Sequence, residues 1–337
     1  MAGIINAMSV DVEDYFQVSA FESHIPRQRW ESLPWRVEAN TTRILDLFDE
    51  AGVKATFFTL GWVAERFPAL VRRIVTDGHE LASHGYDHRR ATDQAPPQFY
   101  EDVVRTKGLL EEVAGVAVKG YRATSYSIGA GNLWALDQLR RAGYRYSSSI
   151  YPIRHDHYGI PDAPRFPFHC QPGQPLLSDQ IPQSDQTLPS NSPYQNDNDI
   201  TPIPASSGDL LLATPAADDL LLEIPISTVL IAGRRIPCGG GGYFRLFPYR
   251  LSRQLLRRLN CESGENDDRG RAAVFYFHPW ELDPGQPRQK GLPFKTRFRH
   301  YLNLKRMESR LRALLHDFHW DRMDRVFAVE LGERERS

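Results

Sequence analysis

The chain has 337 residues, of which 41% are hydrophobic and 25% are charged. This is the composition of a globular protein with a sizeable core, and it excludes wholesale disorder, collagen-like structures and coiled coils. Lys and Arg (41) nearly balance Asp and Glu (42), so the net charge of −1 offers no general attraction for nucleic acid. Three scattered cysteines exclude a disulfide framework and a cysteine-rich zinc site, and they favour a reducing compartment.

The start of the sequence, MAGIINAMSVDVEDYF, contains neither a basic region nor a long apolar run before Asp11. We therefore expect no signal peptide. No stretch of the sequence reaches the roughly 18 apolar residues that are needed to span a bilayer. We expect a cytoplasmic location, and this composition is compatible with a peripheral association with a membrane.

Short apolar runs alternate with amphipathic segments in the first half of the chain. Strands are predicted at residues 4–10, 55–60, 80–83, 118–122 and 144–149. Helices are predicted at residues 40–50, 62–76, 100–113 and 132–141. Thr41 or Thr42 is expected to cap the first helix, and Gly52 follows its end. Strands that alternate with helices predict an α/β fold with a parallel sheet, which is either open or closed as a barrel.

The middle of the chain differs in composition. No Lys or Arg occurs between Arg165 and Arg234, and Asp, Pro, Ser, Gln and Asn are frequent there. Residues 171–217 cannot bury enough apolar surface to offset the entropy of ordering. We interpret them as a disordered acidic, Pro- and Ser-rich insertion within a single domain that comprises residues 1–337.

The last third is again typical of a folded structure. A strand-like run covers residues 220–231, and four consecutive glycines within residues 238–247 predict a turn or a close backbone approach. The Gly-Lys-Ser/Thr ending of a phosphate-binding loop is missing there, so nucleotide binding is not expected. A buried strand is predicted at residues 272–277, and an amphipathic helix at residues 299–318 is expected to close the domain.

Three acidic residues, Asp11, Glu13 and Asp14, directly follow the first apolar run. In an extended segment Asp11 and Glu13 point to one side and Asp14 to the other. Buried together, the three carboxylates would repel one another unless a divalent cation neutralised them. The alternative is a solvated acidic loop or the start of a helix.

Two histidines, His84 and His88, lie four residues apart in SHGYDH, directly after a predicted strand. A turn between them can bring both imidazoles to one metal ion. The alternative is a pair of surface histidines at this spacing by chance. The glutamate of the HExxH protease motif is missing, so a general base must come from elsewhere, and Asp11 is a candidate.

Two further residues follow predicted strands. His278, in FYFHPWE, is well placed to act as a general acid, and the alternative is a core histidine with a satisfied ring. Arg122, in GYRATSYSI, can hold a carboxylate through two parallel hydrogen bonds, and the alternative is a surface ion pair. Because the carboxyl ends of parallel strands lie together, we expect all these segments to meet.

Together and in this order, the four segments resemble the polysaccharide deacetylases of the NodB-homology type, which have a distorted (β/α) barrel. Asp11 matches the first motif of that family, His84 and His88 the second, Arg122 the third and His278 the last. The segments DVEDYFQVSAF, YSSSIYP, EIPISTV, GGGGYFRLFPY and FYFHPWELDPGQPR are most similar to the subfamily linked to exosortase (XrtA/PEP-CTERM) exopolysaccharide loci. The resemblance covers nearly all of the chain except about residues 171–217.

The sequence departs from the family pattern at three places. The commoner first motif has two adjacent aspartates, whereas Asp11 is followed by Val12, so the carboxylate ligand is either Glu13 or Asp14. An extended chain favours Glu13, and a tight turn after Asp11 favours Asp14. Thr124 stands where the family usually has proline, and Ser147 stands where related proteins more often have aspartate.

The resemblance implies metal-assisted hydrolysis of an acetamido group on a sugar. It implies a divalent ion, most readily Zn²⁺, on His84, His88 and Glu13 or Asp14, with an open position for water. Asp11 is then the general base, Arg122 holds it in place, and His278 protonates the departing amine.

Residues that contact the substrate are also implied. A backbone N–H of Thr124 or Ser125 would stabilise the oxyanion, and Tyr126, Trp280 and Tyr243 are candidates to stack on sugar faces. The substrate would be an N-acetylated glycan of an exopolysaccharide or its lipid-linked precursor, acted on beside membrane machinery for polysaccharide assembly. No motif or basic patch indicates a nucleic-acid partner.

Two other functions are compatible with such a barrel. One is a metal-free hydrolase that acts on a cyclic amide or ureide, and the His84/His88 pair argues against it. The other is a non-catalytic carbohydrate-binding component of a polysaccharide assembly system. Metal content distinguishes the first alternative, and acetate release from an acetylated oligosaccharide distinguishes the second.

Overall fold

The computed structural model describes residues 3–156, 158–170, 220–262 and 270–333. The expected insertion at residues 171–217 lies outside the described residues. Among the described residues, no helix combines the length and apolar character needed to cross a membrane.

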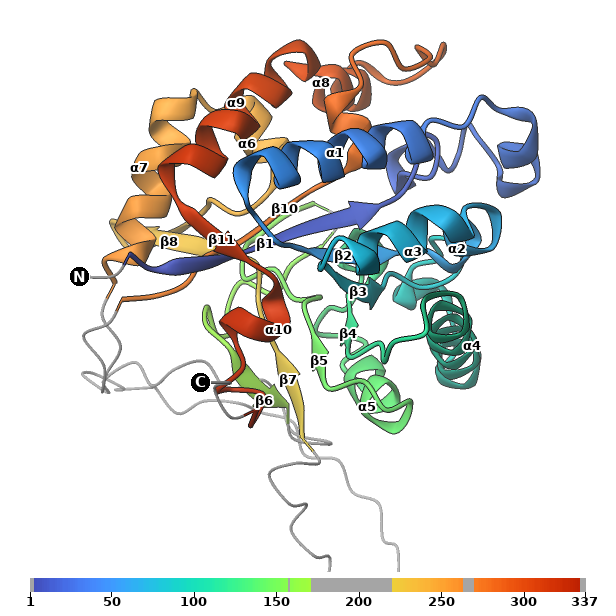
Figure 1. Cartoon of the computed structure of the whole chain (residues 1–337), viewed down its shortest axis with the longest axis horizontal. Coiled ribbons are helices and arrows are strands. Elements are labelled where there is room, and N and C mark those ends of the chain that lie inside the picture. Colours follow the sequence, from blue (N-terminus) through green and yellow to red (C-terminus); the bar gives the residue numbers. More distant parts are fainter. Residues whose placement is uncertain (1–2, 157, 171–219, 263–269, 334–337) are drawn as a thin grey trace, which may run out of the picture.

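A mainly parallel sheet forms the centre of the molecule, with the helices packed around its outside (Figure 1). The strand order is β10-β1-β2-β3-β4-β5-β7-β6, and β11 also pairs with β1. Among the described strands of this sheet, only β6 runs antiparallel to its neighbour, β7. The strands of this sheet are β1 (Ile5–Val12), β2 (Thr56–Thr59), β3 (Glu80–Ser83), β4 (Gly120–Tyr121), β5 (Tyr146–Ser147), β6 (Phe168–Cys170), β7 (Leu221–Glu223), β10 (Val274–Phe277) and β11 (His319–Asp321). The predicted α/β fold with a parallel sheet is confirmed.

The barrel is distorted because its two edge strands, β10 and β6, are not paired with each other in the part of the chain that the structure describes. Beside it lies a separate antiparallel pair, β8 (Thr228–Ile231) and β9 (Arg234–Pro237). The helices are α1 (Val37–Ala51), α2 (Gly61–Arg66), α3 (Pro68–Thr76), α4 (Pro96–Ala114), α5 (Trp134–Arg141), α6 (Gly241–Leu246), α7 (Tyr249–Asn260), α8 (Phe294–Tyr301), α9 (Leu304–Asp317) and α10 (Met323–Val326).

Helix α1 begins earlier than predicted, and neither Thr41 nor Thr42 caps it. The Asp14 carboxylate instead accepts hydrogen bonds from the N–H groups of Arg36 (2.6 Å) and Val37 (2.9 Å) at its first turn. A carboxylate from a distant part of the chain thus does the work of a local cap. The predicted end is confirmed, because Gly52 follows α1 with a left-handed φ of 65°.

Three predicted elements are divided in two. The helix expected at residues 62–76 breaks before Pro68, whose ring disfavours a helical conformation of the preceding residue. The helix expected at residues 299–318 breaks at Asn303, which has a φ of 53° and donates a side-chain hydrogen bond to the Arg245 carbonyl. The run at residues 220–231 contains Pro225 and forms β7 and β8.

The glycine-rich segment combines a close backbone approach with the start of a helix. A Cβ atom on Gly239 would lie 2.2 Å from the Val274 carbonyl oxygen, and one on Gly241 would lie 2.4 Å from Glu281 Oε2. The close approach was expected, but helix α6, which begins at Gly241, and helix α7 were not. Glycine at these two positions therefore lets the segment lie close against β10 and against Glu281, which follows the carboxyl end of that strand.

Candidate metal centre

Four parallel strands deliver the predicted residues to one edge of the sheet. Strand β1 ends just before Glu13, β3 just before His84, β4 just before Arg122 and β10 just before His278. In the sheet, β10 lies beside β1 and β3 lies beside β4. The side chains that follow these strands therefore converge, as expected from parallel strands with a common carboxyl edge.

Glu13, His84 and His88 form the centre of the site. One ligand atom from each lies within 4.8 Å of the other two, and all three side chains are buried. Oε2 of Glu13 lies 2.6 Å from Nε2 of His88 but accepts no hydrogen bond with suitable geometry. A buried carboxylate oxygen without a hydrogen bond requires another partner. Two imidazoles and one carboxylate around a shared point are the donor set of a catalytic zinc site with an open position.

The protonation states fit the same interpretation. Burial alone would raise the pKa of Glu13, but the charges of His88, His278 and His84 outweigh it and lower this pKa to about 2. Burial lowers the pKa of His84 to about 4. The Arg122 carbonyl oxygen lies 2.8 Å from His84 Nδ1 and can only accept a hydrogen bond. Nδ1 therefore carries the proton and Nε2 keeps its lone pair, as a metal ligand must.

Asp14 lies outside this group. The chain turns at Val12, where the Glu13 N–H donates to the Asp11 carbonyl at 3.0 Å. This turn was expected to favour Asp14 as a ligand, but Glu13 faces the histidines nevertheless. The Asp14 carboxylate already accepts three backbone N–H groups, including that of Tyr15, and burial raises its pKa to about 6. Its task in this structure is to hold the start of α1.

Asp11 is fixed by the fully buried guanidinium of Arg122. Nη1 of Arg122 donates to Asp11 Oδ1 at 2.6 Å and to the Ser9 hydroxyl at 2.9 Å. Nε and Nη2 of Arg122 donate to the carbonyl and the hydroxyl of Ser148. The Phe58 ring lies under the guanidinium, 4.0 Å from it. With its partners satisfied, this arginine can hold Asp11 as an oriented carboxylate.

His278 faces both carboxylates of the site. Its Nε2 lies 3.7 Å from Glu13 Oε1 and 3.9 Å from Asp11 Oδ2, and a fifth of its side chain is exposed. Its Nδ1 lies 2.6 Å from Glu281 Oε1. Burial lowers the pKa of His278, but the charges of Glu13, Glu281 and Asp11 outweigh it and raise this pKa to about 9. The imidazole is thus a proton donor at neutral pH that reaches the solvent side of the site.

The predicted substrate contacts are placed differently from one another. Trp280 is buried, stacks on His278 and His300, and donates from Nε1 to Glu13 Oε1 at 3.2 Å. Tyr126 is buried as well. A sugar ring stacks on an exposed face, which neither side chain offers in this structure, and their assignment to substrate binding stays a prediction. Tyr243, on α6, is partly exposed and remains a candidate.

Thr124 and Ser125 lie in a short 3-10 turn that begins two residues after Arg122. The Thr124 hydroxyl donates to the Arg89 carbonyl, and the Ser125 hydroxyl lies 2.6 Å from that of Ser19. Ser125 and Tyr126 both have positive φ values, 53° and 52°. Such backbone strain outside glycine is held in place by its surroundings and is frequent near functional sites. The assignment of an oxyanion donor to this turn stays a prediction.

Several supporting residues were not predicted from the sequence. Glu281 Oε2 accepts a hydrogen bond from Arg245 Nε at 2.8 Å, and Glu281 thereby joins His278 to a buried guanidinium. Glu223 accepts the N–H groups of Ser149 and Ile150 at 2.8 and 2.7 Å, next to the serine that holds Arg122. Both glutamates occur in motifs that were noted, FYFHPWE and EIPISTV. The contacts of Glu223 and that of Glu281 with Arg245 join distant segments, for which the sequence carries no local signal.

Residues 30–147 match the family model of polysaccharide deacetylases, and residues 189–328 match a domain of unknown function, DUF3473. The chain is thus similar to polysaccharide deacetylases over residues 30–147. A peptidoglycan-N-acetylglucosamine deacetylase of Bacillus cereus is 36% identical over 99 residues, which are 29% of this chain and 36% of that protein. A peptidoglycan deacetylase of Helicobacter pylori is 28% identical over 113 residues, which are 34% of this chain and 38% of that protein.

The chain thus spans little more than a third of the length of these two relatives. A solved structure from Mycobacterium smegmatis, assigned to the polysaccharide deacetylases, has a TM-score of 0.49 and 21% identity, and the match covers 98% of this chain and 92% of that one. The family match ends at residue 147 and so includes His84, His88 and Arg122 but begins after Asp11 and Glu13.

Proposed function

We propose that this protein is a metal-dependent hydrolase that removes N-acetyl groups from amino sugars of a polysaccharide. The observation that carries the proposal is the buried group of Glu13, His84 and His88, whose ligand atoms lie within 4.8 Å of one another. These three residues would hold a divalent ion, and their donor set suits Zn²⁺ well, although Co²⁺, Fe²⁺, Ni²⁺ and Mn²⁺ accept it too. When bound, such an ion acidifies water and polarises a carbonyl oxygen.

The remaining residues supply proton transfer. Asp11, with one oxygen held by Arg122, is placed to take a proton from the attacking water. His278, held by Glu281 and protonated at neutral pH, is placed to give a proton to the departing amine. Without that proton the amine would have to leave as an anion. An acid and a base on neighbouring strands, β10 and β1, therefore serve opposite ends of one hydrolysis.

The resemblance of several segments to proteins of exopolysaccharide loci supports a more specific proposal. In it, the substrate is an exopolysaccharide or its lipid-linked precursor, the protein acts in the cytoplasm, and it associates peripherally with membrane machinery for polysaccharide assembly. The metal-free alternative leaves the Glu13, His84 and His88 group without a task. The non-catalytic alternative leaves the oriented Asp11 and the raised pKa of His278 without one.

A matched pair of variants tests the metal centre. We expect the purified protein to contain about one divalent ion per chain and to release acetate from oligomers of N-acetylglucosamine. Glu13→Gln is expected to lose the metal, because an amide oxygen is a far weaker ligand than a carboxylate. Asp14→Asn changes the neighbouring residue in the same way and is expected to keep the metal. Metal content of both variants is the measurement, and equal metal content in Glu13→Gln and wild type contradicts the assignment.

A further inference from the structure

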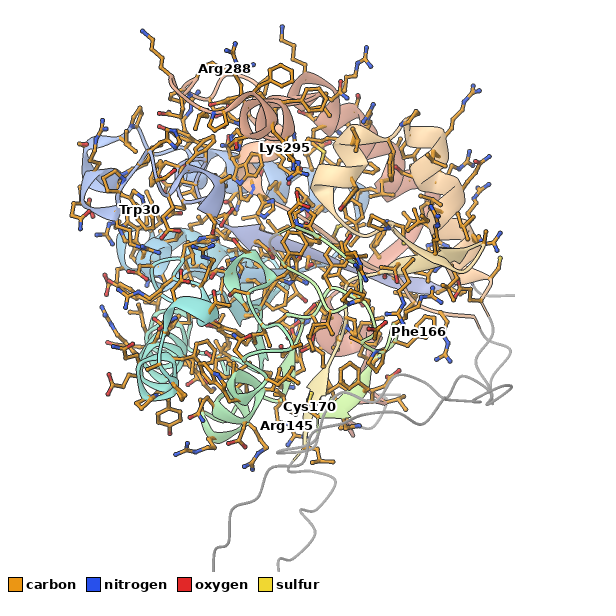
Figure 2. The ribbon with its side chains drawn as sticks, turned by 180° about the vertical axis from the view of Figure 1, so that it is seen from behind. Trp30, Arg145, Phe166, Cys170, Arg288 and Lys295 are labelled. Carbon is orange, nitrogen blue, oxygen red and sulfur yellow. The ribbon has the colours of Figure 1, made fainter. Side chains whose placement is uncertain are left out.

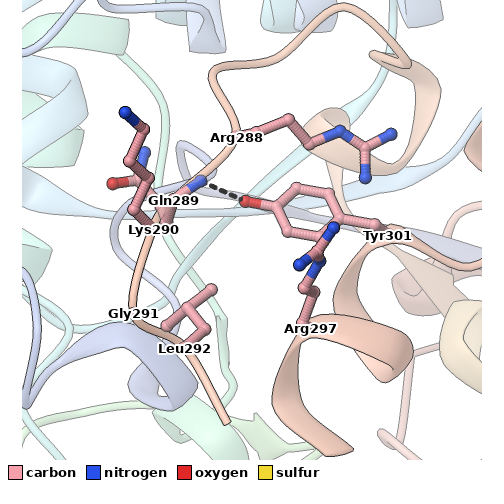
Figure 3. Close-up of a pocket in the computed structure, with 7 residues that line it drawn as sticks. All are labelled: Arg288, Gln289, Lys290, Gly291, Leu292, Arg297 and Tyr301. Atoms are coloured by element: carbon pink, nitrogen blue, oxygen red, sulfur yellow. Dashed lines mark hydrogen bonds between the residues drawn. The ribbon is translucent and has the colours of Figure 1, made fainter. Parts of the chain in front are cut away.

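A surface cavity of about 420 Å³ lies between the loop that precedes α8 and α8 itself. Its lining includes Arg288, Lys290, Arg297 and Tyr301 (Figure 3). The volume is in the range of sites that bind small molecules or single sugar units. Figure 2 shows Arg288 and Lys295 at the same end of the molecule, away from Cys170 and Arg145.

The charge around this cavity is one-sided. Residues 284–307 contain seven Lys or Arg and no Asp or Glu, although the whole chain has a net charge of −1. Lys295 and Arg299, on α8, both face the Asp156 carboxylate, at 2.7 and 3.8 Å. For the cavity cations Arg288, Lys290 and Arg297, no carboxylate lies within ion-pair distance among the described residues. These three cations are thus available for a ligand.

The loop that carries these cations is anchored. The Gln286 side chain donates to the Trp280 carbonyl at 2.8 Å, and the Gln289 N–H donates to the Tyr301 hydroxyl at 2.9 Å (Figure 3). The Arg288 guanidinium lies 4.2 Å from the centre of the Tyr301 ring, which restrains it by a cation–π contact. A charged group on an anchored loop loses less entropy on binding than one on a free chain.

A short chain of ring contacts connects the cavity to the metal ligands. Tyr301 follows His300, whose ring stacks on Trp280 with centres 4.2 Å apart and planes at 12°. Trp280 in turn donates to Glu13 at 3.2 Å. The cavity is thus only a few side chains away from the metal ligands, within the reach of the neighbouring units of a sugar chain bound at the metal centre.

We propose that Arg288 and Arg297, with Lys290 at the rim, bind a carboxylate or phosphate group carried by the glycan substrate. Paired N–H donors of arginine match the oxygens of both groups. The inference rests on the proposed deacetylase function and deepens it, because the preferred substrate is then an anionic N-acetylated glycan. An acetylated sugar with a uronate or phosphate on a neighbouring unit fits both the cavity and the metal centre.

Another occupant of this surface is a membrane with anionic lipids, because Phe294 and Phe298 on α8 are exposed by 83% and 46%. The observations favour the glycan for two reasons. The two phenylalanine rings stack on each other, 6.2 Å apart, and Lys295 and Arg299, which directly follow Phe294 and Phe298, both face the Asp156 carboxylate. Arg288, Lys290 and Arg297, which have no carboxylate partner among the described residues, line a cavity instead of a flat face.

The test compares a neutral oligomer of N-acetylglucosamine with an oligomer of equal length that alternates N-acetylglucosamine and glucuronate, and with a phosphorylated N-acetylglucosamine oligomer. Acetate release is measured for wild type and for the triple variant Arg288→Gln/Lys290→Gln/Arg297→Gln. We expect wild type to prefer an anionic oligomer, and the triple variant to raise KM for it about tenfold at low salt without changing kcat. The effect is expected to shrink with added salt. Whether glucuronate or phosphate gives the larger effect identifies the anion.

The matched control is Arg250→Gln on α7, which also removes one exposed arginine and is expected to leave every rate unchanged. Equal kinetics of wild type and the triple variant on all three oligomers overturn the inference. Binding to vesicles of anionic phospholipid that depends on the three cations, with no kinetic effect on the glycans, overturns it in favour of the membrane. If no oligomer is deacetylated, the proposed function fails instead. Equilibrium binding of the anionic and neutral oligomers to wild type and the triple variant then decides the inference separately.

Discussion

The Asp11 carboxylate and the Arg122 guanidinium form a buried ion pair, with Oδ1 and Nη1 2.6 Å apart and neither side chain more than 2% exposed. The two residues are 111 positions apart in the sequence. They meet because Asp11 lies near the end of β1 and Arg122 directly follows β4, at the same edge of the parallel sheet. Arg122 also donates to the Ser9 hydroxyl and to the carbonyl and hydroxyl of Ser148, and it contacts Met323 and the Phe58 ring. The second carboxylate oxygen of Asp11 remains on the side of His278.

Asp11→Asn is expected to reduce acetate release by at least about a hundredfold, because an amide cannot accept the proton. The variant is expected to keep its metal, since Asp11 is not among the three proposed ligands. It also leaves the Arg122 charge without a counter-charge, so stability falls by on the order of 3 kcal/mol. Activity, metal content and urea unfolding check the three parts, with Asp49→Asn on the exposed face of α1 as the control. Full activity in Asp11→Asn rejects it as the base.

Removal of the metal is expected to destabilise the fold. A ligand present at about 100 times its dissociation constant stabilises a protein by about 2.7 kcal/mol. We therefore expect a chelator to lower the thermal midpoint of wild type by several degrees, and added Zn²⁺ to restore it. His84→Ala is expected to show no response to chelator or Zn²⁺, because it lacks a ligand. An identical chelator response in His84→Ala and wild type is incompatible with the proposed centre.

We expect the buried side chain of His79 to make the folded protein less stable in mild acid. Burial, followed by the charges of Lys54, Arg322 and Arg73, lowers the pKa of His79 to about 3. Its Nδ1 accepts the Ala55 N–H at 3.1 Å, which requires the neutral ring. The unfolded chain binds this proton at a pKa near 6.5, so the stabilisation is complete above pH 6.5 and is lost as the pH falls toward 3.

The measurement is the free energy of unfolding in urea between pH 7.5 and pH 4.5. His79→Gln keeps an acceptor for the Ala55 N–H but does not titrate, so its stability is expected to fall less steeply with acid than that of wild type. Since one pKa unit corresponds to about 1.4 kcal/mol, the difference in slope amounts to a few kcal/mol over this range. The control His316→Gln removes a histidine whose side chain is 89% exposed. Parallel pH profiles of wild type and His79→Gln would show that the buried ring has no such role.

Glu223 is predicted to position Arg122 without contacting the substrate. It accepts the N–H groups of Ser149 and Ile150, and the Ser149 hydroxyl in turn accepts the Ala123 N–H. Glu223→Ala leaves two buried N–H groups without an acceptor, which costs about 1–3 kcal/mol each. We expect lower kcat, normal metal content and reduced stability in Glu223→Ala. Glu223→Gln retains an acceptor oxygen and should recover most of kcat. Equal kcat values in the two variants and wild type would show that Glu223 does not position Arg122 for catalysis.

Local sequence determined much of the fold because its signals act over short distances. Apolar runs marked β1, β2, β3 and β10. The acids after β1, the histidines after β3, the arginine after β4 and the histidine after β10 marked the edge where the site forms. Gly52 marked the end of α1 for a local reason, its left-handed φ. Pro68 and Pro225 were also visible in the sequence, and the breaks beside them follow from the geometry of the proline ring. The break at Asn303 had no comparable signal.

Only the tertiary structure decided which carboxylate faces the histidines, and it did so through Asp14. That side chain is bound by the N–H groups of Arg36 and Val37, more than twenty residues along the chain, which leaves Glu13 for His84 and His88. It likewise buried Trp280 between the site and His300, and gathered Arg288 and Arg297 around Tyr301. Periodicity and residue type report what a segment prefers by itself. Which partner meets which group depends on packing between distant segments, and that information exists only in the folded chain.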